Sequence, residues 1–167
     1  QTLLKSSGSG NETLWDLRLV PSTDGASSSF EFRLNNSQVA DTSIGSRAFS
    51  MSLAYNNMSD GQLWNVMLQR DTGSSSGPGT VKYKLYSALQ DGRAIRPNSF
   101  TSMSISGGLV GNSTLGGKGF FANQNFQSSG SRHALSSSNL FVGETLSGSL
   151  AEVKGWSTAL SFSKFRQ

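Results

Sequence analysis

The sequence predicts an all-β protein, and three observations favour that class. Short segments alternate apolar and polar residues with the two-residue period of a strand. Clusters of Gly, Ser, Asn and Asp separate these segments, as turns do. Charged residues make up only 14% of the chain and aromatic residues 10%, whereas a helical bundle would carry more Ala, Glu, Lys and Leu. Short strands joined by polar turns account for this composition.

Three segments in the first third of the chain have one apolar face. Residues 14–20 alternate with a Trp-Leu-Leu face, and residues 29–36 with a Phe-Phe-Leu face that includes Phe32. Residues 48–55 alternate with a Phe-Met-Leu-Tyr face that includes Phe49. The opposite faces of the last two carry Glu, Arg or Ser, so these strands are predicted to bury one side and leave the other wet.

The middle of the chain predicts three more strands. Residues 62–70, which include Trp64, are apolar on both faces, so they form either a central strand or a strand that meets a partner. Residues 80–90 alternate again and are predicted to form a hairpin with residues 62–70, because strands adjacent in sequence usually pair. Residues 99–107 supply the third strand.

The last sixty residues combine an unassigned region with an apolar end. Residues 107–138 are rich in Gly, Ser and Asn and predict no element, whereas residues 139–144 predict a short strand. Residues 147–165 allow two interpretations: a final core strand followed by a short clamp of Trp156, Leu160 and Phe165 that closes the fold, or an amphipathic helix that binds a partner. The two-residue period before Trp156 favours the strand and clamp, and Trp156→Ala is then expected to unfold the domain by opening a cavity worth roughly 3–5 kcal/mol.

One hydrophobic core is enough for a chain of 167 residues, so a single domain is predicted. Residues 1–10 show little periodicity and are predicted to be a linker or an edge segment, with the domain spanning residues 11–167. The predicted core residues are Phe32, Phe49, Trp64, Phe141, Val153, Trp156 and Leu160.

An ordered motif occupies residues 139–165, under a fifth of the chain. Its elements are Phe141–Val142–Gly143, Gly148, Leu150–Ala151–Glu152–Val153, Trp156 and Ala159–Leu160–Ser161. Their order resembles the closing motif of the concanavalin A-like lectin/glucanase superfamily, in its laminin G-like branch. The resemblance implies an antiparallel two-sheet jelly-roll sandwich with a short helical turn near the C-terminus.

The reactive residues form no recognisable catalytic pattern. Glucanases on this fold use paired carboxylates on one strand, and the nearest approach to that spacing is Glu12 with Asp16, for which a solvated strand edge is the preferred interpretation. His133 is the single histidine, no Gly-x-Ser-x-Gly elbow accompanies it, and the chain has no cysteine. No catalytic residue is predicted, and the protein is expected not to be an enzyme.

Charge and hydropathy limit the expected partners. The net charge is +4 and the pI about 9.7, yet the basic residues are spread along the chain rather than clustered. This distribution favours solubility over a nucleic-acid footprint. No apolar run approaches the roughly 18 residues that a membrane-spanning helix needs, so membrane insertion is not expected.

The resemblance also implies a candidate ligand site, because laminin G-like domains often hold calcium at the sandwich rim through Asp and Asn oxygens. The candidate rim residues are Asp71, Asp91, Asn112, Asn123 and Asn125. They are not clustered in the sequence, so calcium stays an open alternative, and no other metal or cofactor is expected.

Two function hypotheses remain open. The first is a non-enzymatic structural or adhesive module of an extracellular or virion surface, phage-like in character, whose partners are other protein subunits. The second is a carbohydrate-binding, lectin-like module, calcium-assisted in one version, whose partner is a glycan. Trp15, Trp64 and Trp156 all lie in strand patterns, so the sequence predicts no exposed aromatic platform for a sugar.

Overall fold

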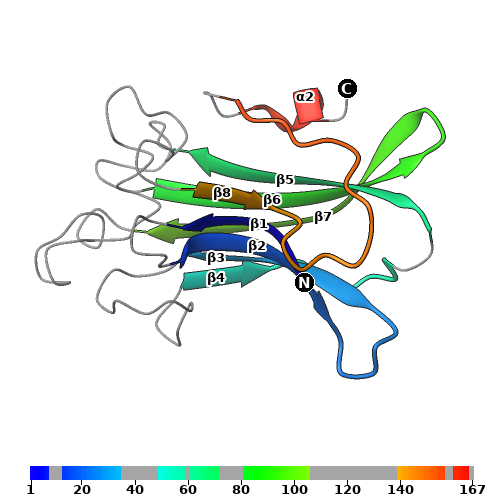
Figure 1. The fold of residues 1–167 in the computed structure, drawn as a ribbon. Coiled ribbons are helices and arrows are strands. Elements are labelled where there is room, and N and C mark those ends of the chain that lie inside the picture. Colours follow the sequence, from blue (N-terminus) through cyan, green and yellow to red (C-terminus); the bar gives the residue numbers. More distant parts are fainter. Residues whose placement is uncertain are drawn as a thin grey trace, which may run out of the picture.

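The computed structural model shows an all-β protein in which two antiparallel sheets pack face to face as a β-sandwich (Figure 1). The structure describes residues 1–7, 13–34, 49–58, 61–71, 81–105, 139–156 and 160–165. The predicted fold class and the two-sheet sandwich are therefore confirmed.

The larger sheet has five strands, and all its neighbouring pairs are antiparallel. Its strands are β1 (Thr2–Ser7), β2 (Thr13–Pro21), β3 (Ser28–Leu34), β4 (Phe49–Ser52) and β8 (Asn139–Val142). Their order across the sheet is β4-β3-β2-β1-β8. Trp15 lies opposite Leu34 and Leu17 opposite Phe32, so one face of β2 and β3 is continuously apolar.

The smaller sheet has three strands in the order β5-β6-β7. They are β5 (Leu63–Asp71), β6 (Val81–Asp91) and β7 (Ala94–Ile105). β5 and β6 form the predicted hairpin. The turn from β6 to β7 passes through Gly92, whose φ of 58° belongs to the left-handed region that tight two-residue hairpin turns require.

The N-terminal segment is a strand rather than a linker or an edge, which corrects the expectation for residues 1–10 as far as Ser7. β1 lies between β2 and β8 and pairs with both. The sequence hides this strand because its pairing with β2 shifts register between Thr2 and Leu4 and again between Ser6 and Ser7. Such irregularities break the alternation on which a strand prediction depends.

Aromatic side chains join the two sheets. The ring of Phe32 in β3 lies 5.3 Å from that of Tyr83 in β6 and 6.3 Å from that of Trp15 in β2, measured between centroids. Phe32 is 1% exposed and Trp64 packs against this core while partly buried. The side chain of Phe49 lies outside the described part of the structure.

The C-terminal segment does not form the predicted core strand. Residues 148–156 have no strand conformation, and Val153 and Trp156 are 48% and 51% exposed. The predicted core position of Val153 and the predicted clamp position of Trp156 are therefore wrong, and Leu160 is only partly buried. The alternating pattern of this segment shows which side chains would share a face if a strand formed. A strand also needs a partner, and this segment pairs with no described strand.

A short helix, α2 (Phe162–Phe165), ends the described chain, as the closing motif implies. Its Phe162 ring stacks on the Tyr86 ring of β6 with centroids 5.0 Å apart. Tyr86 alternates with the core residues Tyr83 and Leu85, so α2 contacts the outer face of the smaller sheet. Figure 1 shows this end of the chain above β5.

Phe32→Ala is expected to destabilise the fold by about 3–5 kcal/mol, because it opens a cavity where both sheets meet. Trp156→Ala is expected to cost less than about 1 kcal/mol, because half of that side chain is already in water. Urea unfolding of the two variants measures both. A larger loss for Trp156→Ala than for Phe32→Ala would contradict this assignment of the core.

Tyr83 makes stability depend on alkaline pH. Burial raises its pKa from 10.0 to about 12, and the nearby Arg70 guanidinium opposes part of that rise. A pKa that is higher in the folded state stabilises the protein fully below pH 10, and this stabilisation is lost as the pH rises from about 10 to 12.

The free energy of unfolding of Tyr83→Phe should therefore fall less than that of the wild type over that interval, by up to about 3 kcal/mol. Urea unfolding at pH 9 and at pH 11.5 measures the difference. Tyr55→Phe, at an exposed position, is the matched control and should follow the wild type. Equal pH dependence of all three proteins would refute the assignment.

Candidate functional site

The two described rim candidates lie at opposite ends of the smaller sheet. Asp71 ends β5 beside the start of β6, opposite Lys82, whereas Asp91 ends β6 beside the turn to β7. Asp71 Oδ2 lies 2.8 Å from Lys84 Nζ, and Asp91 Oδ2 lies 2.8 Å from a terminal nitrogen of Arg96.

The whole length of the eleven-residue strand β6 therefore separates these carboxylates, and each is neutralised by its own cation. They do not fit a shared calcium site. Three further rim candidates fall outside the described residues: Asn112, Asn123 and Asn125.

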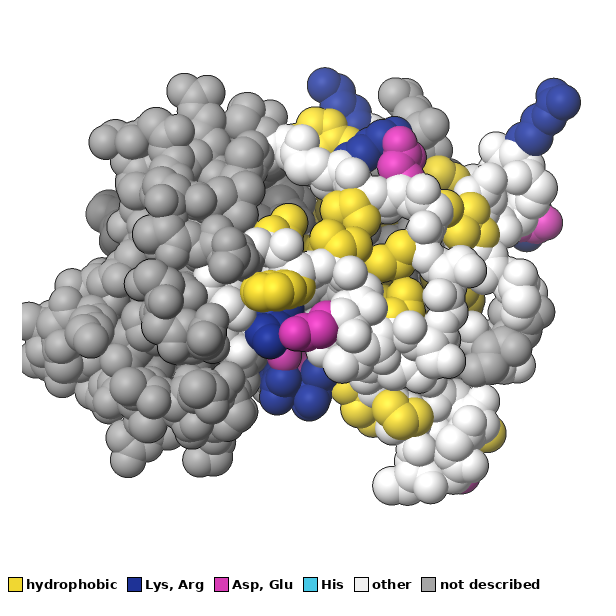
Figure 2. Space-filling view, viewed as in Figure 1, with side chains coloured by type: hydrophobic (Ala, Val, Ile, Leu, Met, Phe, Trp, Pro, Cys, Tyr) yellow, Lys and Arg dark blue, Asp and Glu magenta, His cyan; other side chains and the backbone are white. Residues whose placement is uncertain are grey.

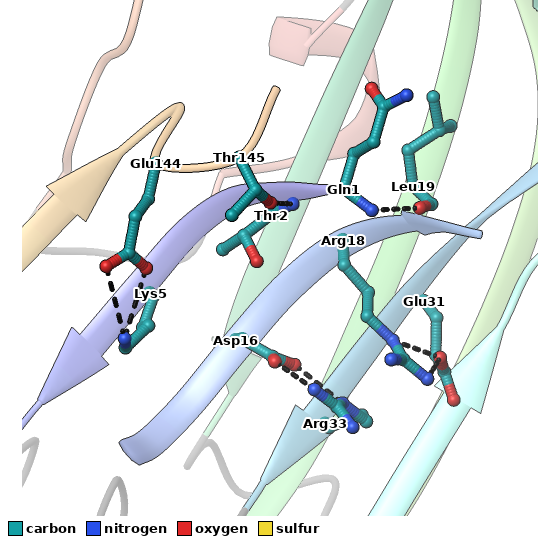
Figure 3. A network of polar contacts seen from close by, with 10 residues as sticks. All are labelled: Gln1, Thr2, Lys5, Asp16, Arg18, Leu19, Glu31, Arg33, Glu144 and Thr145. Carbon is teal, nitrogen blue, oxygen red and sulfur yellow. Dashed lines mark hydrogen bonds and ion pairs between the residues drawn. The ribbon is translucent and has the colours of Figure 1, made fainter. Parts of the chain in front are cut away.

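Charged residues form cross-strand pairs on the outer face of the larger sheet (Figure 3). Arg18 of β2 lies opposite Glu31 of β3, and its Nε donates a hydrogen bond of 2.6 Å to Glu31 Oε2. Two residues away on the same face of these strands, Asp16 lies opposite Arg33. The guanidinium of Arg33 donates hydrogen bonds to the Asp16 carboxylate from Nε and from a terminal nitrogen. Such two-point pairing of a guanidinium with a carboxylate fixes geometry as well as charge.

The Asp16–Arg33 pair corrects the expectation of a solvated strand edge at Asp16. Asp16 is 4% exposed and lies in an interior strand of the sheet. Its hydrogen bond raises the pKa of Arg33 above the ordinary value, although burial acts in the opposite direction. Glu12, the other member of the carboxylate pair considered in the sequence, lies outside the described residues.

A third ion pair ties the turn after β8 to β1. Lys5 Nζ lies 3.1 Å from Glu144 Oε2 and 5.3 Å from the centroid of the Phe141 ring. Phe141 lies opposite Lys5, so its ring is on the outer face of the sheet rather than in the predicted core. A cation over an aromatic face is attracted to it, and the contact holds one side of the ring against the protein.

The most distinctive surface of the described chain is the apolar edge formed by β8. Leu140, Phe141 and Val142 are 42%, 37% and 49% exposed. We call these three side chains the β8 patch. Figure 2 shows hydrophobic side chains gathered in the middle of the face on which Figure 1 draws β8 and the chain that follows it. Three consecutive exposed apolar side chains on one strand are unusual for a surface that only meets water.

Unequal sheet widths explain why the patch is exposed. β7 lies beside β4, and Phe32 of β3 contacts Tyr83 of β6, so the smaller sheet packs toward the β4 edge of the larger sheet, away from β8. Leu140 and Val142 lie opposite Ser6 and Leu4 and therefore point to the core side of the larger sheet. β8 extends beyond the smaller sheet, so nothing in the described chain fully covers its inner face.

The chain after β8 covers part of this region. It turns at Gly143, whose φ of 66° lies in the left-handed region that favours glycine. Leu146 then packs against the core. A Cβ at Gly143 would lie 3.3 Å from Leu150 Cδ1, so Leu150 is close to the end of β8. Leu150 itself is exposed and enlarges the apolar surface.

A group of stacked aromatic rings lies on the outer face of the smaller sheet. Tyr86 stacks on Phe100 at 4.7 Å, and Phe162 and Phe165 of α2 pack on the same Tyr86 ring at 5.0 and 6.3 Å. Phe100 is half exposed. The rings of this group bury apolar area against α2, and the Phe100 ring keeps part of its surface in contact with solvent.

The β8 patch is not among the residues predicted from the sequence, although a signal for it exists. Residues 139–144 place Leu140, Phe141 and Val142 in succession, so this short strand, like residues 62–70, is apolar on both faces. A short strand without an alternating polar face has two apolar faces, and a sandwich buries only one of them.

Other kinds of site find no support in the described residues. Within the described ranges, no group of three or more His, Cys, Asp or Glu side chains is placed to hold a metal ion. No described helix is both long enough and apolar enough to cross a membrane. Comparison with protein-family models, with curated proteins and with solved structures finds no match to this chain.

Arg33→Met is expected to destabilise the protein by about 3 kcal/mol, because it leaves the buried Asp16 carboxylate without its partner. Arg96→Met removes a cation from the exposed pair with Asp91 and should change stability by less than about 0.5 kcal/mol. Thermal and urea unfolding at neutral pH compare the two variants. Similar small effects would show that the outer-face pairs do not stabilise the sheet.

Proposed function

We propose that this chain is a non-enzymatic structural or adhesive module of a larger assembly at an extracellular or virion surface. Its partners are other protein subunits. The observation that carries the proposal is the β8 patch, where an outermost strand exposes three apolar side chains. Contact with a neighbouring subunit would remove that apolar area from water and pair the backbone groups of a strand edge that no other described strand pairs with.

The charged residues support a structural role. Six carboxylates of the described chain lie in ion pairs: Asp16, Glu31, Asp71, Asp91, Glu144 and Glu152. A glycoside hydrolase of this general fold needs one carboxyl group with a raised pKa beside a second that stays ionised. Carboxylates that each face a cation favour stabilisation of strands over proton transfer.

The fold proposed with this function is the laminin G-like jelly roll of the concanavalin A-like superfamily. Two antiparallel sheets and a short helix at Phe162–Phe165 support it, together with the order of the closing motif. Lectins, hydrolases and inert spacers share this scaffold, so the proposed function rests on the β8 patch and not on the fold.

A carbohydrate-binding module is the second candidate, and one observation favours it. Trp156 and Phe100 are both half exposed, contrary to the expectation that the chain offers no aromatic platform. Aromatic rings at a surface can stack on sugar rings. A calcium-assisted version would draw its ligands from Asn112, Asn123 and Asn125, because Asp71 and Asp91 lie apart and are ion-paired.

Cryo-electron microscopy of the protein in its native assembly tests the proposal. We expect the β8 patch to be covered by a neighbouring protein subunit, because only burial removes its apolar area from water. A patch that faces solvent in the assembly, with sugar or cation density beside Trp156, would overturn the structural role and support the second candidate.

A glycan array gives an independent check with the purified chain. The structural proposal predicts no glycan signal above background for the wild type. A signal that is lost in Trp156→Ala and kept in Leu63→Ala, at another exposed apolar position, would instead identify a sugar site at Trp156.

A further inference from the structure

We infer that the β8 patch pairs with the β8 patch of a second copy of this chain, through antiparallel edge pairing about a two-fold axis. The inference rests on the proposed structural role and names the partner. It follows from three properties of β8: its position as an outermost strand, its apolar side chains on both faces, and the single register that matches these side chains to themselves.

The backbone of β8 is prepared for a further strand. β8 pairs with β1 through four consecutive residues without a register shift, so its free edge carries regularly spaced amide and carbonyl groups. No described strand pairs with that edge. Regular geometry and unpaired backbone groups are what strand addition requires.

Register follows from which face each side chain occupies. Residues directly opposite in an antiparallel pair share a face, so Phe141 must meet Phe141 of the copy or a residue an even number of positions away. When Phe141 pairs with itself, Leu140 meets Val142 of the copy on the core side. A shift of two residues in either direction places Asn139 or Gly143 opposite Phe141, so the self-paired register matches apolar side chains best.

Charge does not oppose this arrangement. Among the described residues, Lys5 and Glu144 lie beside the patch and form an ion pair with no net charge. β8 itself carries no charged residue. Two copies can therefore approach without bringing together uncompensated like charges, and the Lys5 ammonium already covers one side of each Phe141 ring.

The size of the patch sets the strength of the contact. Three partly exposed side chains fall short of the roughly 800 Å² per partner that stable interfaces bury. Pairing of isolated chains should therefore depend on concentration, and it becomes stronger where an assembly holds copies close together. This behaviour suits a subunit contact inside a larger structure.

Cysteine cross-linking tests the pairing directly, because the chain has no cysteine of its own. Opposite residues in an antiparallel pair have Cα atoms about 4.5–5.5 Å apart, within the range that a disulfide bridges. In the full chain, Phe141→Cys should form a covalent dimer under mild oxidation at least roughly tenfold faster than Val153→Cys. Val153 is a matched control because it is as exposed as Val142 but lies outside β8.

A second variant keeps the inference testable if Phe141→Cys folds poorly. Sedimentation of the wild type should show a reversible dimer as concentration rises toward about 1 mM, the range expected of a small interface. Leu140→Lys should abolish this dimer, and Val153→Lys should keep it.

Equal cross-linking of the two cysteine variants, or a wild type that stays monomeric at about 1 mM, overturns self-pairing. So does a dimer that survives Leu140→Lys. Coverage of the β8 patch by a different subunit in the native assembly would overturn self-pairing and leave the proposed structural function intact. The two proposals therefore fail separately.

Discussion

The contact between Phe32 and Tyr83 joins the two sheets, and much of the remaining structure follows from where that contact lies. It holds β3 against β6, while β7 lies beside β4. A smaller sheet positioned in this way packs toward the β4 edge of the larger sheet and leaves β8, at the opposite edge, only partly covered. The same packing that buries Phe32 therefore exposes Leu140 and Val142, although all three side chains point to the core side of the larger sheet.

The outer face of the larger sheet supports the same register by a different interaction. A slip of one residue between β2 and β3 would turn Leu17 outward and bring Asp16 into the core. In the native register Asp16 meets Arg33, and Arg18 meets Glu31, so the ion pairs and the apolar face specify one alignment together. This agreement explains how a chain with few charged residues can place Asp16 almost entirely out of water.

Apolar and polar patterning in the sequence located seven of the eight described strands, because most of these strands carry an apolar face that packs toward the core and turn residues bound all of them. It missed β1, whose register shifts disturb the pattern, and it wrongly added residues 148–156, whose pattern is strand-like although no described strand pairs with them. The candidate site was less predictable. Asp71 and Asp91 end two consecutive strands, and the hairpin that the sequence predicts for these strands already places the two carboxylates at opposite ends of the sheet, although the cation that neutralises each one is visible only in the structure. Exposure at β8 depends on the width of the other sheet, which no local pattern encodes.

The edges of the two sheets differ in how well they are protected, and this difference gives the β8 patch its meaning. β7 carries Pro97 beside a register shift, and β4 is four residues long with exposed Ser50 and Ser52. Proline, irregular pairing and short polar strands are devices that keep sheet edges from joining other chains. β8 has regular pairing, no proline and no charge. The fourth edge strand, β5, also pairs regularly, but it ends in Arg70 and Asp71 and exposes only Leu63 among its apolar side chains. Of the four described edges, β8 is therefore the one most suited to being covered, and its partner is most economically another strand edge.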